Sequence, residues 1–170
     1  HQQIWQVRIS EDVRRFMFNQ EIFPFSDHLN FVEKLKTDTT KVYFAVYNND
    51  NQFVGSISLH PINYAQRTAD WGIYINPTHQ GKGLGAHLSK MFFDHIFALN
   101  IIDKISATVL SFNHTSLKFH LHIGFQHQYK KDGNIYLIKE NISSCQENIV
   151  NVIRDYSAFL DSFSSIISNY

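Results

Sequence analysis

The stretch that most constrains the fold is DWGIYINPTHQGKGLGAHL at residues 70–88, where a strand, a glycine-rich turn and a helix follow one another directly. Residues 71–75 are mostly aromatic or β-branched, as a half-buried strand requires. Pro77 ends the strand because proline cannot donate a hydrogen bond to a ladder. Apolar side chains then recur at helical spacing over residues 86–99. The chain is therefore predicted to pass from a sheet directly into the N-terminus of a helix.

A turn of this kind is suited to binding an anion. The first four N–H groups of a helix have no partner within it, and the helix dipole places partial positive charge beside them. Gly81, Gly83 and Gly85 have no Cβ atoms that would keep a ligand away from the backbone. Lys82 adds a cation at the rim. The turn is therefore predicted to bind a phosphate or a pyrophosphate.

Two common phosphate-binding motifs fit the turn poorly. A P-loop is excluded because the turn lacks its Gly-Lys-Ser/Thr sequence at the required spacing. A dinucleotide fingerprint nearly matches at Gly81, Gly83 and Ala86, and Asp103 stands near the position of the expected ribose-binding acid. However, strand-like segments precede the turn and the chain is short for a doubly wound domain, so NAD binding is disfavoured. A glycine-rich linker without a ligand is a further alternative.

The turn resembles the coenzyme loop of the GNAT N-acetyltransferases, whose Gln-x-x-Gly-x-Gly pattern is met at positions 80, 83 and 85. The resemblance implies that acetyl-coenzyme A (acetyl-CoA) is the cosubstrate and that the loop amides hold its pyrophosphate. The coenzyme-binding residues predicted in the loop are Gln80, Gly81, Lys82, Gly83, Leu84 and Gly85. The strand before the loop, near Tyr74 and Ile75, is predicted to supply a backbone N–H to the oxyanion that develops during transfer.

A second stretch, NHTSLKFH at residues 113–120 followed by Gly-Phe, strengthens this resemblance. In the family an Asn ends the fifth strand and a small residue faces the coenzyme three positions later, which implies these roles for Asn113 and Ser116. A Tyr usually stands seven residues after the Asn and acts as the acid, but here that position is His120. An imidazolium with a pKa of about 6.5 can protonate a thiolate whose acid has a pKa of about 8.5, so His120 is the predicted general acid. In the alternative, His120 points elsewhere and water protonates the sulfur.

The remaining segments predict an α+β fold around one mixed sheet. Helices are predicted at residues 2–20, 27–36 (after a cap at Ser26), 86–99, 113–122 and 148–167. In an alternative to the continuous first helix, a cap at Ser10 starts a new helix. Strands are predicted at 41–47, 53–60, 67–75, 104–110, 124–129 and 135–139, with hairpin turns at 48–51 and 131–134. This order resembles the GNAT fold from residue 4 to residue 140, but without the strand that usually precedes the first helix. An acetyltransferase domain is predicted at residues 1–143, and a helical extension at 144–170 is predicted to serve packing or a homodimer contact.

Composition argues against several other functions. The chain of 170 residues has 15 basic and 15 acidic side chains, so its zero net charge gives no electrostatic footprint for nucleic acid or a membrane surface. No run is apolar enough to span a bilayer, and a single Cys145 fits a reducing cytoplasm. Histidines are densest at residues 114–127, but no HExxH or Cys/His pattern accompanies them, so no metal is predicted.

Two further parts of the sequence resemble the N-acetyltransferases of the pseudaminic acid pathway. They are RISEDVRRFMF (8–18) with HLNFVE (28–33), and FVGSIS (53–58) with DWGIYI (70–75). The resemblance implies that the acceptor is a small-molecule amino-sugar nucleotide, UDP-4-amino-4,6-dideoxy-N-acetyl-β-L-altrosamine, acetylated on its 4-amino group. The residues implied to bind it are Arg8, Met17, His28, Phe31 and Ser56. Arg and His can face the diphosphate while Met and Phe pack on uracil, or Met17 and Phe31 are ordinary core residues.

Three points stay open at the level of the sequence. The base that takes the amine proton is Asp70, His60 or a water held by Ser56 or Thr108. The second choice of acceptor is the N-terminus of a ribosomal protein, because enzymes of that type share the glycine loop and the 113–116 run. A coenzyme-binding module without catalysis is a third alternative, because His120 stands where Tyr is expected.

Overall fold

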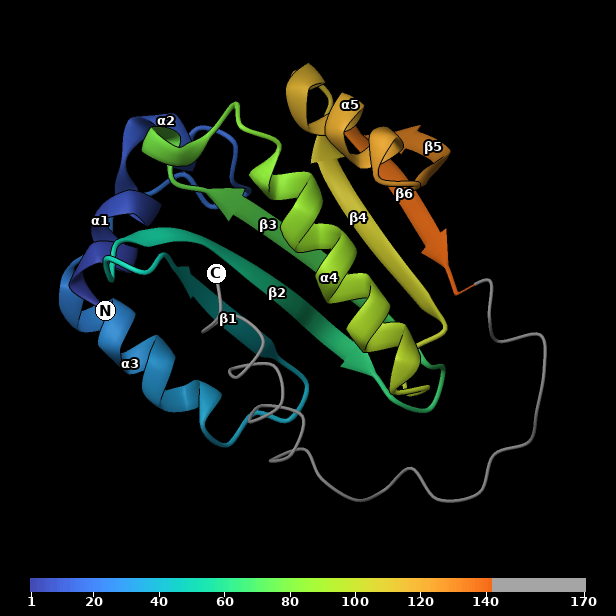
Figure 1. Cartoon of the computed structure of the whole chain (residues 1–170), viewed down its shortest axis with the longest axis horizontal. Helices are drawn as coiled ribbons and strands as arrows, with labels where there is room; N and C mark the ends of the chain where they lie inside the picture. The colour runs from blue at the N-terminus through green and yellow to red at the C-terminus, as the bar shows by residue number, and fades with distance from the viewer. Residues whose placement is uncertain (142–170) are drawn as a thin grey trace.

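Runs of β-branched and aromatic residues that alternate between two faces form most strands of a six-stranded sheet with the order β1-β2-β3-β4-β6-β5 (Figure 1). The structure is a computed structural model and describes residues 1–141. The strands are β1 (Val42–Tyr47), β2 (Phe53–Asn63), β3 (Thr68–Ile75), β4 (Lys104–Leu110), β5 (Gln126–Lys131) and β6 (Asn134–Glu140). The helices are α1 (Gln2–Ile9), α2 (Glu11–Arg14), α3 (Phe25–Leu35), α4 (Leu84–Ala98) and α5 (His114–His122), with a 3-10 turn η1 (Pro77–His79). The predicted α+β fold around one mixed sheet is confirmed.

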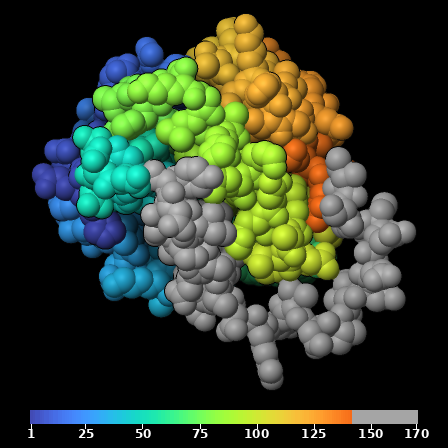
Figure 2. Space-filling model, viewed as in Figure 1, coloured from blue at the N-terminus to red at the C-terminus, as the bar shows by residue number. Residues whose placement is uncertain are grey.

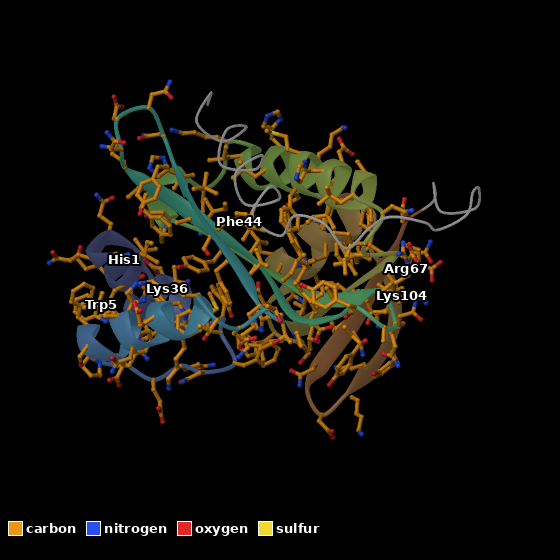
Figure 3. All side chains as sticks on the ribbon, turned by 90° about the horizontal axis from the view of Figure 1, so that it is seen from below. His1, Trp5, Lys36, Phe44, Arg67 and Lys104 are labelled. Carbon is orange, nitrogen blue, oxygen red and sulfur yellow. The ribbon has the colours of Figure 1, made fainter. Side chains whose placement is uncertain are left out.

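Helices lie on both faces of the sheet. Helix α4 crosses one face over the middle strands, and α5 lies beside it over β4 and β6 (Figure 1). Helices α1 and α3 lie on the opposite side of the strands from α4, near β1 (Figure 3). On the molecular surface α4 runs between the N-terminal part of the chain and the α5 segment (Figure 2). The helical layers therefore give the two faces of the sheet different surroundings.

An aromatic core fixes α4 against the sheet. Phe92 is fully buried, and the centre of its ring lies 5.9 Å from that of Phe44 and 5.9 Å from that of Trp71. The neighbouring Phe93 ring is centred 4.6 Å from Trp71. Aromatic pairs at these distances add to the free energy of burial. The rings hold α4 against β3, which places the loop between them at a fixed point of the sheet.

The two central strands pair over a short length only. Strands β3 and β4 are the parallel pair of this sheet, and their register covers Thr68↔Lys104, Ala69↔Ile105 and Asp70↔Ser106. Both strands continue for several residues beyond this pairing, so their C-terminal ends diverge. The glycine loop follows β3 and helix α5 follows β4. The gap between the strands therefore opens beside both motifs that the sequence singles out.

The N-terminal helices differ from the prediction. The helix predicted at residues 2–20 breaks at Ser10, which is extended, with φ −62° and ψ 147°. Ser10 does begin α2, but its hydroxyl donates to the Val7 carbonyl instead of capping the helix. Helix α3 begins at Phe25 with Pro24 as its N-terminal boundary, so the predicted cap at Ser26 is wrong. Tertiary packing, which local cap signals do not report, decides these boundaries.

The other predicted elements agree within a few residues. Strand β2 runs beyond residue 60 to residue 63 because its pairing with β3 resumes at Ile62↔Ala69 after an irregularity. Among residues 1–141 no strand precedes α1, as the sequence predicts. The predicted helix at 148–167 and the extension at 144–170 lie outside the described residues. Within residues 1–141, no helix has the length and hydropathy to cross a membrane.

Replacing Phe92 tests whether the aromatic core carries the stability of the fold. We expect Phe92→Ala to lower the free energy of unfolding by about 3–5 kcal/mol, because it empties a site enclosed by other rings. Phe18→Ala is the control: this side chain is 65% exposed, and we expect a change within about 0.5 kcal/mol. Urea unfolding followed by tryptophan fluorescence measures both. Equal losses for the two variants would contradict the assignment of the core.

Candidate active site

The loop between β3 and α4 has the shape of an open cradle. Gly81 and Gly83 have φ values of 80° and 72°, in the left-handed region that favours glycine. A Cβ atom at either position would meet no atom within 4 Å, so the space in front of the backbone is free. Helix α4 begins at Leu84 without a side-chain cap, which leaves its first N–H groups directed at this space. The loop can therefore bind an anion as predicted.

Gly85 has a different role from the one predicted. A Cβ atom at this position would lie 3.3 Å from the Phe119 ring and 3.7 Å from the Ile75 side chain. The absent side chain thus lets α4 approach α5 and β3 closely, instead of opening the backbone to a ligand. The third glycine of the motif is a packing glycine.

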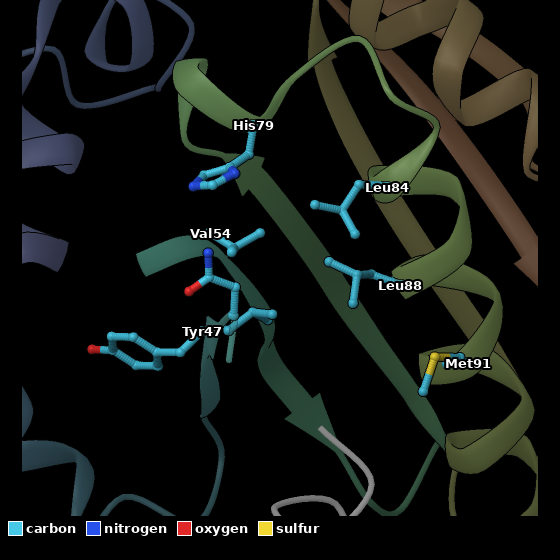
Figure 4. Close-up of a pocket in the computed structure, with 8 residues that line it drawn as sticks. Tyr47, Val54, His79, Leu84, Leu88 and Met91 are labelled. Atoms are coloured by element: carbon cyan, nitrogen blue, oxygen red, sulfur yellow. The ribbon is translucent and has the colours of Figure 1, made fainter. Parts of the chain in front are cut away.

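The other loop residues divide between structure and solvent. The Gln80 side chain donates to the Ile75 carbonyl at 2.9 Å and so holds the loop against the end of β3. The Leu84 side chain points into an apolar pocket of about 120 Å³ between α4 and the β1–β2 hairpin, together with Val54, Leu88 and Met91 (Figure 4). Only the backbone N–H of Leu84 is then directed at the cradle. Lys82 is exposed and forms no ion pair with any residue in the described part of the chain.

At the edge of β3 that faces the gap, the backbone N–H of Ile75 is available to a ligand, whereas that of Tyr74 is not. In an antiparallel pair, N–H groups point alternately toward and away from the partner strand. The N–H of Asn76 donates to Val54 of β2, so the N–H of Tyr74 also points toward β2 while that of Ile75 points into the gap. Of the two positions predicted for the oxyanion donor, Ile75 has the suitable orientation. Tyr74 contributes its side chain to the other face of the sheet.

Asn113 and Ser116 form the start of the opposite wall. Asn113 caps helix α5 with its side-chain oxygen, which accepts from the Ser116 N–H at 3.0 Å. The loop from β4 thus turns into α5 at the open end of the gap. The structure brings both predicted coenzyme contacts to the wall that faces the glycine loop.

His120 is buried and both of its ring nitrogens have partners. It is 6% exposed, its Nε2 accepts from the Trp71 indole N–H at 3.0 Å, and its Nδ1 lies 2.8 Å from the Ser116 carbonyl. Burial lowers the pKa of His120, and the bond to the Ser116 carbonyl opposes this effect only in part. This geometry argues against the predicted acid role, because no ring N–H is left to donate to a leaving thiolate.

Several predicted acceptor-binding residues meet on the face of the sheet opposite α4. Arg8 of α1 lies within electrostatic range of Tyr43 on β1 and Tyr74 on β3, and Ser56 of β2 hydrogen-bonds Tyr74. Burial lowers the pKa of Arg8, raises that of Tyr43 to about 12, and raises that of Tyr74 further. Phe31 of α3 packs edge-on against Tyr43, with ring centres 5.1 Å apart. We call Arg8, Phe31, Tyr43, Ser56 and Tyr74 the polar pocket.

Two other predicted residues lie on the same side of the sheet but contribute differently. His28 is 7% exposed and stacks on Phe25, with ring centres 6.0 Å apart. Met17 lies half-buried in the turn after α2, where its N–H donates to the Arg14 carbonyl. Phe31 remains 39% exposed, so it is not the ordinary core residue of the alternative interpretation.

Among residues 1–141, two side-chain nitrogens on this side of the sheet are buried without a hydrogen-bond partner. They are Nη1 of Arg8 and Nε2 of His28, whereas Nη2 of Arg8 donates to the Asn19 carbonyl at 3.1 Å. A buried donor or acceptor without a partner costs free energy, so such atoms are rare in folded proteins. A polar ligand that reaches them would remove this cost.

The candidates for the base lie on the polar-pocket face of the sheet. Ser106 donates a hydrogen bond to the exposed Asp70 carboxylate, at the point where β3 and β4 separate. His60 stacks on Tyr43 with ring centres 5.1 Å apart. Burial lowers the pKa of His60, while the Asp70 charge acts in the opposite direction. Among residues 1–141, no group of three His, Cys, Asp or Glu side chains is arranged to hold a metal ion.

Sequence reasoning missed the side chains of Tyr43, Tyr74 and Trp71 as parts of the site. The two-residue period of a strand places Trp71 and Tyr74 on opposite faces, so the sequence could have predicted the face on which each side chain lies. The sequence could not predict which residue each side chain contacts, because these contacts join distant segments.

Comparison with known proteins identifies the family. Residues 6–125 match the Acetyltransferase (GNAT) family, which is more than half of the chain. The chain belongs to this family. It is an acetyl-CoA-dependent N-acetyltransferase. The open cradle and the uncapped helix fit the coenzyme pyrophosphate, and acetyl-CoA supplies the acetyl thioester when bound.

The relatives of this acetyltransferase include two differently named acetyltransferases. It is 29% identical over 143 residues to the acetyltransferase PseH of Campylobacter jejuni, covering 84% of this chain and 87% of the relative. It is 26% identical over 122 residues to the spermidine N(1)-acetyltransferase of Escherichia coli K12, covering 72% of this chain and 65% of the relative.

Solved structures of both kinds share its fold. The spermidine N-acetyltransferase of Vibrio cholerae, solved with CoA and spermine, superposes with a TM-score of 0.72 at 22% identity, covering 81% of this chain and 87% of that one. The C. jejuni PseH structure superposes with a TM-score of 0.60 at 28% identity, covering 68% of this chain and 79% of that one. The six-stranded sheet and its flanking helices are therefore the GNAT fold.

Filling the cradle tests the loop assignment. We expect Gly83→Val to weaken acetyl-CoA binding by at least about tenfold, because a branched side chain at φ 72° strains the backbone and occupies the space in front of it. Isothermal titration calorimetry with acetyl-CoA measures the affinity. Gly133→Val is the matched control, since Gly133 has φ 75° and open space but lies in the β5–β6 turn. Wild-type affinity in the Gly83 variant would refute the assignment.

Proposed function

We propose that this acetyltransferase transfers the acetyl group of acetyl-CoA to the 4-amino group of UDP-4-amino-4,6-dideoxy-N-acetyl-β-L-altrosamine, for pseudaminic acid synthesis. The observation that carries the proposal is the buried, unpartnered Nη1 of Arg8 beside the polar pocket. The sequence resemblance to acetyltransferases of this pathway and the PseH relative support it. Transfer takes place directly from coenzyme to sugar in a ternary complex.

Arg8 gives the polar pocket the charge that a nucleotide diphosphate requires. A guanidinium binds phosphate oxygens through two parallel N–H donors, and one of its terminal nitrogens is free here. The unpartnered Nε2 of His28 on the same side of the sheet can serve the same anion. Phe31, partly exposed at the edge of the pocket, offers a ring on which uracil can stack. Met17, in the turn after α2, can pack on the same base.

The reaction needs few protein groups. The acceptor amine loses a proton, its nitrogen attacks the thioester carbonyl, and the C–S bond breaks to release coenzyme A as a thiolate. The Ile75 N–H, directed into the gap, can donate to the carbonyl oxygen as it becomes negative. Asp70 and His60 are the candidates to take the amine proton, since both lie on the acceptor face at or near the opening.

A polyamine acceptor is the second candidate, because spermidine acetyltransferases are among the relatives. A polycation would enter a pocket whose buried charge is the Arg8 guanidinium, so like charges would repel. An anionic nucleotide sugar would instead be attracted to the Arg8 guanidinium. The charge of the polar pocket therefore favours the UDP-sugar over spermidine.

Direct comparison of acceptors tests the proposal. We expect thiol release from acetyl-CoA with the UDP-4-amino sugar at a kcat/KM at least about a hundredfold above those for spermidine and for an N-terminal peptide of a ribosomal protein. Turnover of spermidine or of the peptide alone would overturn the sugar assignment while keeping the enzyme class. Turnover of no amine, with acetyl-CoA still bound, would identify a coenzyme-binding module.

Removing the guanidinium tests the pocket itself. We expect Arg8→Ala to raise the KM for the UDP-sugar about 10- to 150-fold, the effect of losing about 1.5–3 kcal/mol of hydrogen bonding to a charged group. Arg8→Lys should recover part of this loss, because it restores the charge but not the planar fork. Arg15→Ala is the control, since Arg15 is exposed and paired only loosely with Asp12 at 3.8 Å. An unchanged KM in Arg8→Ala would exclude Arg8 from the binding site.

A further inference from the structure

His120 is held in one protonation state by its two partners. The Ser116 carbonyl can only accept a hydrogen bond, so the His120 nitrogen 2.8 Å away, Nδ1, carries a proton. The Trp71 indole can only donate, so Nε2, 3.0 Å from it, offers its lone pair. The ring is therefore the neutral tautomer with its proton on Nδ1, and each nitrogen is already engaged.

An acid role would disrupt this arrangement. To donate from Nε2 the ring must first be protonated there, which would direct an N–H at the N–H of Trp71. To donate from Nδ1 it would have to break its bond to the Ser116 carbonyl. The rings of Trp71, Phe119 and Phe125 surround His120, with centres 5.2–6.0 Å from that of the imidazole, and contribute no charge that would stabilise an imidazolium.

The same hydrogen bond joins the two walls of the gap. Trp71 is the first residue of β3 beyond its pairing with β4, which ends at Asp70↔Ser106. His120 lies on α5, the helix that begins with Asn113 and Ser116 on the opposite wall. The bond thus bridges 49 positions in sequence and connects the strand that leads to the glycine loop with the helix that faces it.

We infer that His120 is a positioning residue, which fixes the spacing of the coenzyme gap through Trp71, and is not the general acid. This role is independent of the acceptor and does not rest on the proposed sugar substrate. The coenzyme A thiolate then takes its proton from water, and the proton lost by the amine returns to solvent. Water was the alternative that the sequence left open for this step.

A double-mutant cycle tests the inference. We expect His120→Phe and Trp71→Phe each to weaken acetyl-CoA binding about tenfold, because each leaves a buried nitrogen without a partner. The double variant should bind no more weakly than either single variant, because both polar groups are then gone. Equilibrium binding of acetyl-CoA without any acceptor is the readout, so failure of the proposed sugar substrate leaves this test intact. Additive losses in the double variant would overturn the inference.

His120→Gln separates positioning from acid catalysis. The Gln side-chain oxygen can accept from the Trp71 indole, so we expect the affinity for the coenzyme to stay within about threefold of wild type. We also expect kcat and the alkaline limb of its pH profile to be unchanged. A fall in kcat of about a hundredfold or more at unchanged coenzyme affinity, with the alkaline limb lost, would restore His120 as the acid. The kinetics use whichever acceptor amine is turned over.

The same set of variants includes a control for effects on folding. His122→Phe is the matched control, because His122 lies two residues further along α5 and is exposed, and it should leave affinity and kcat unchanged. Thermal unfolding monitors each variant. If a single Phe variant fails to fold, His120→Gln decides alone, through its coenzyme affinity and pH profile.

Discussion

The short parallel pairing of β3 with β4 is the constraint on which the site depends. A strand edge that leaves its neighbour exposes N–H and C=O groups that must find other partners. Gln80 takes one carbonyl of β3, at Ile75, and the Trp71–His120 hydrogen bond lies where the separation begins. The N–H of Ile75 points into the gap. A ligand in the gap can therefore pair with the sheet much as a strand would.

Strand β3 borders both proposed substrate sites because its side chains alternate between the two faces of the sheet. Trp71, Ile73 and Ile75 contribute to the apolar side of the sheet under α4 and α5. Asp70 and Tyr74 lie on the other face, with Ser106, Ser56 and Arg8. The coenzyme loop and the polar pocket are thus built from neighbouring residues of one strand. In the proposed reaction, the acetyl group has only to cross the thickness of the sheet, through the gap that β4 leaves.

Local patterns predicted the elements well because period and turn chemistry are local. The strand–glycine–helix order and the two hairpin turns each depend on residues a few positions apart, and the structure has all of them. The sequence left the break at Ser10 open and placed the start of α3 wrongly, because competing cap signals stand close together and packing chooses between them.

The site was predicted less completely because its decisive contacts are long-range. A His seven residues after an Asn indicates an acid by resemblance, but the Trp71 indole that engages it is 49 positions away. The motif likewise cannot show that Gly85 faces Phe119 whereas Gly83 faces open space.

The topology also divides the sheet into two antiparallel groups of strands, which a short parallel pairing joins. Strands β1 to β3 form one antiparallel meander and β4, β6 and β5 another antiparallel group, whose pairings are mostly close in sequence. The three-residue parallel junction and the helices beside it join the two groups. The coenzyme gap is part of that junction, and a molecule bound across it holds the two halves of the protein together.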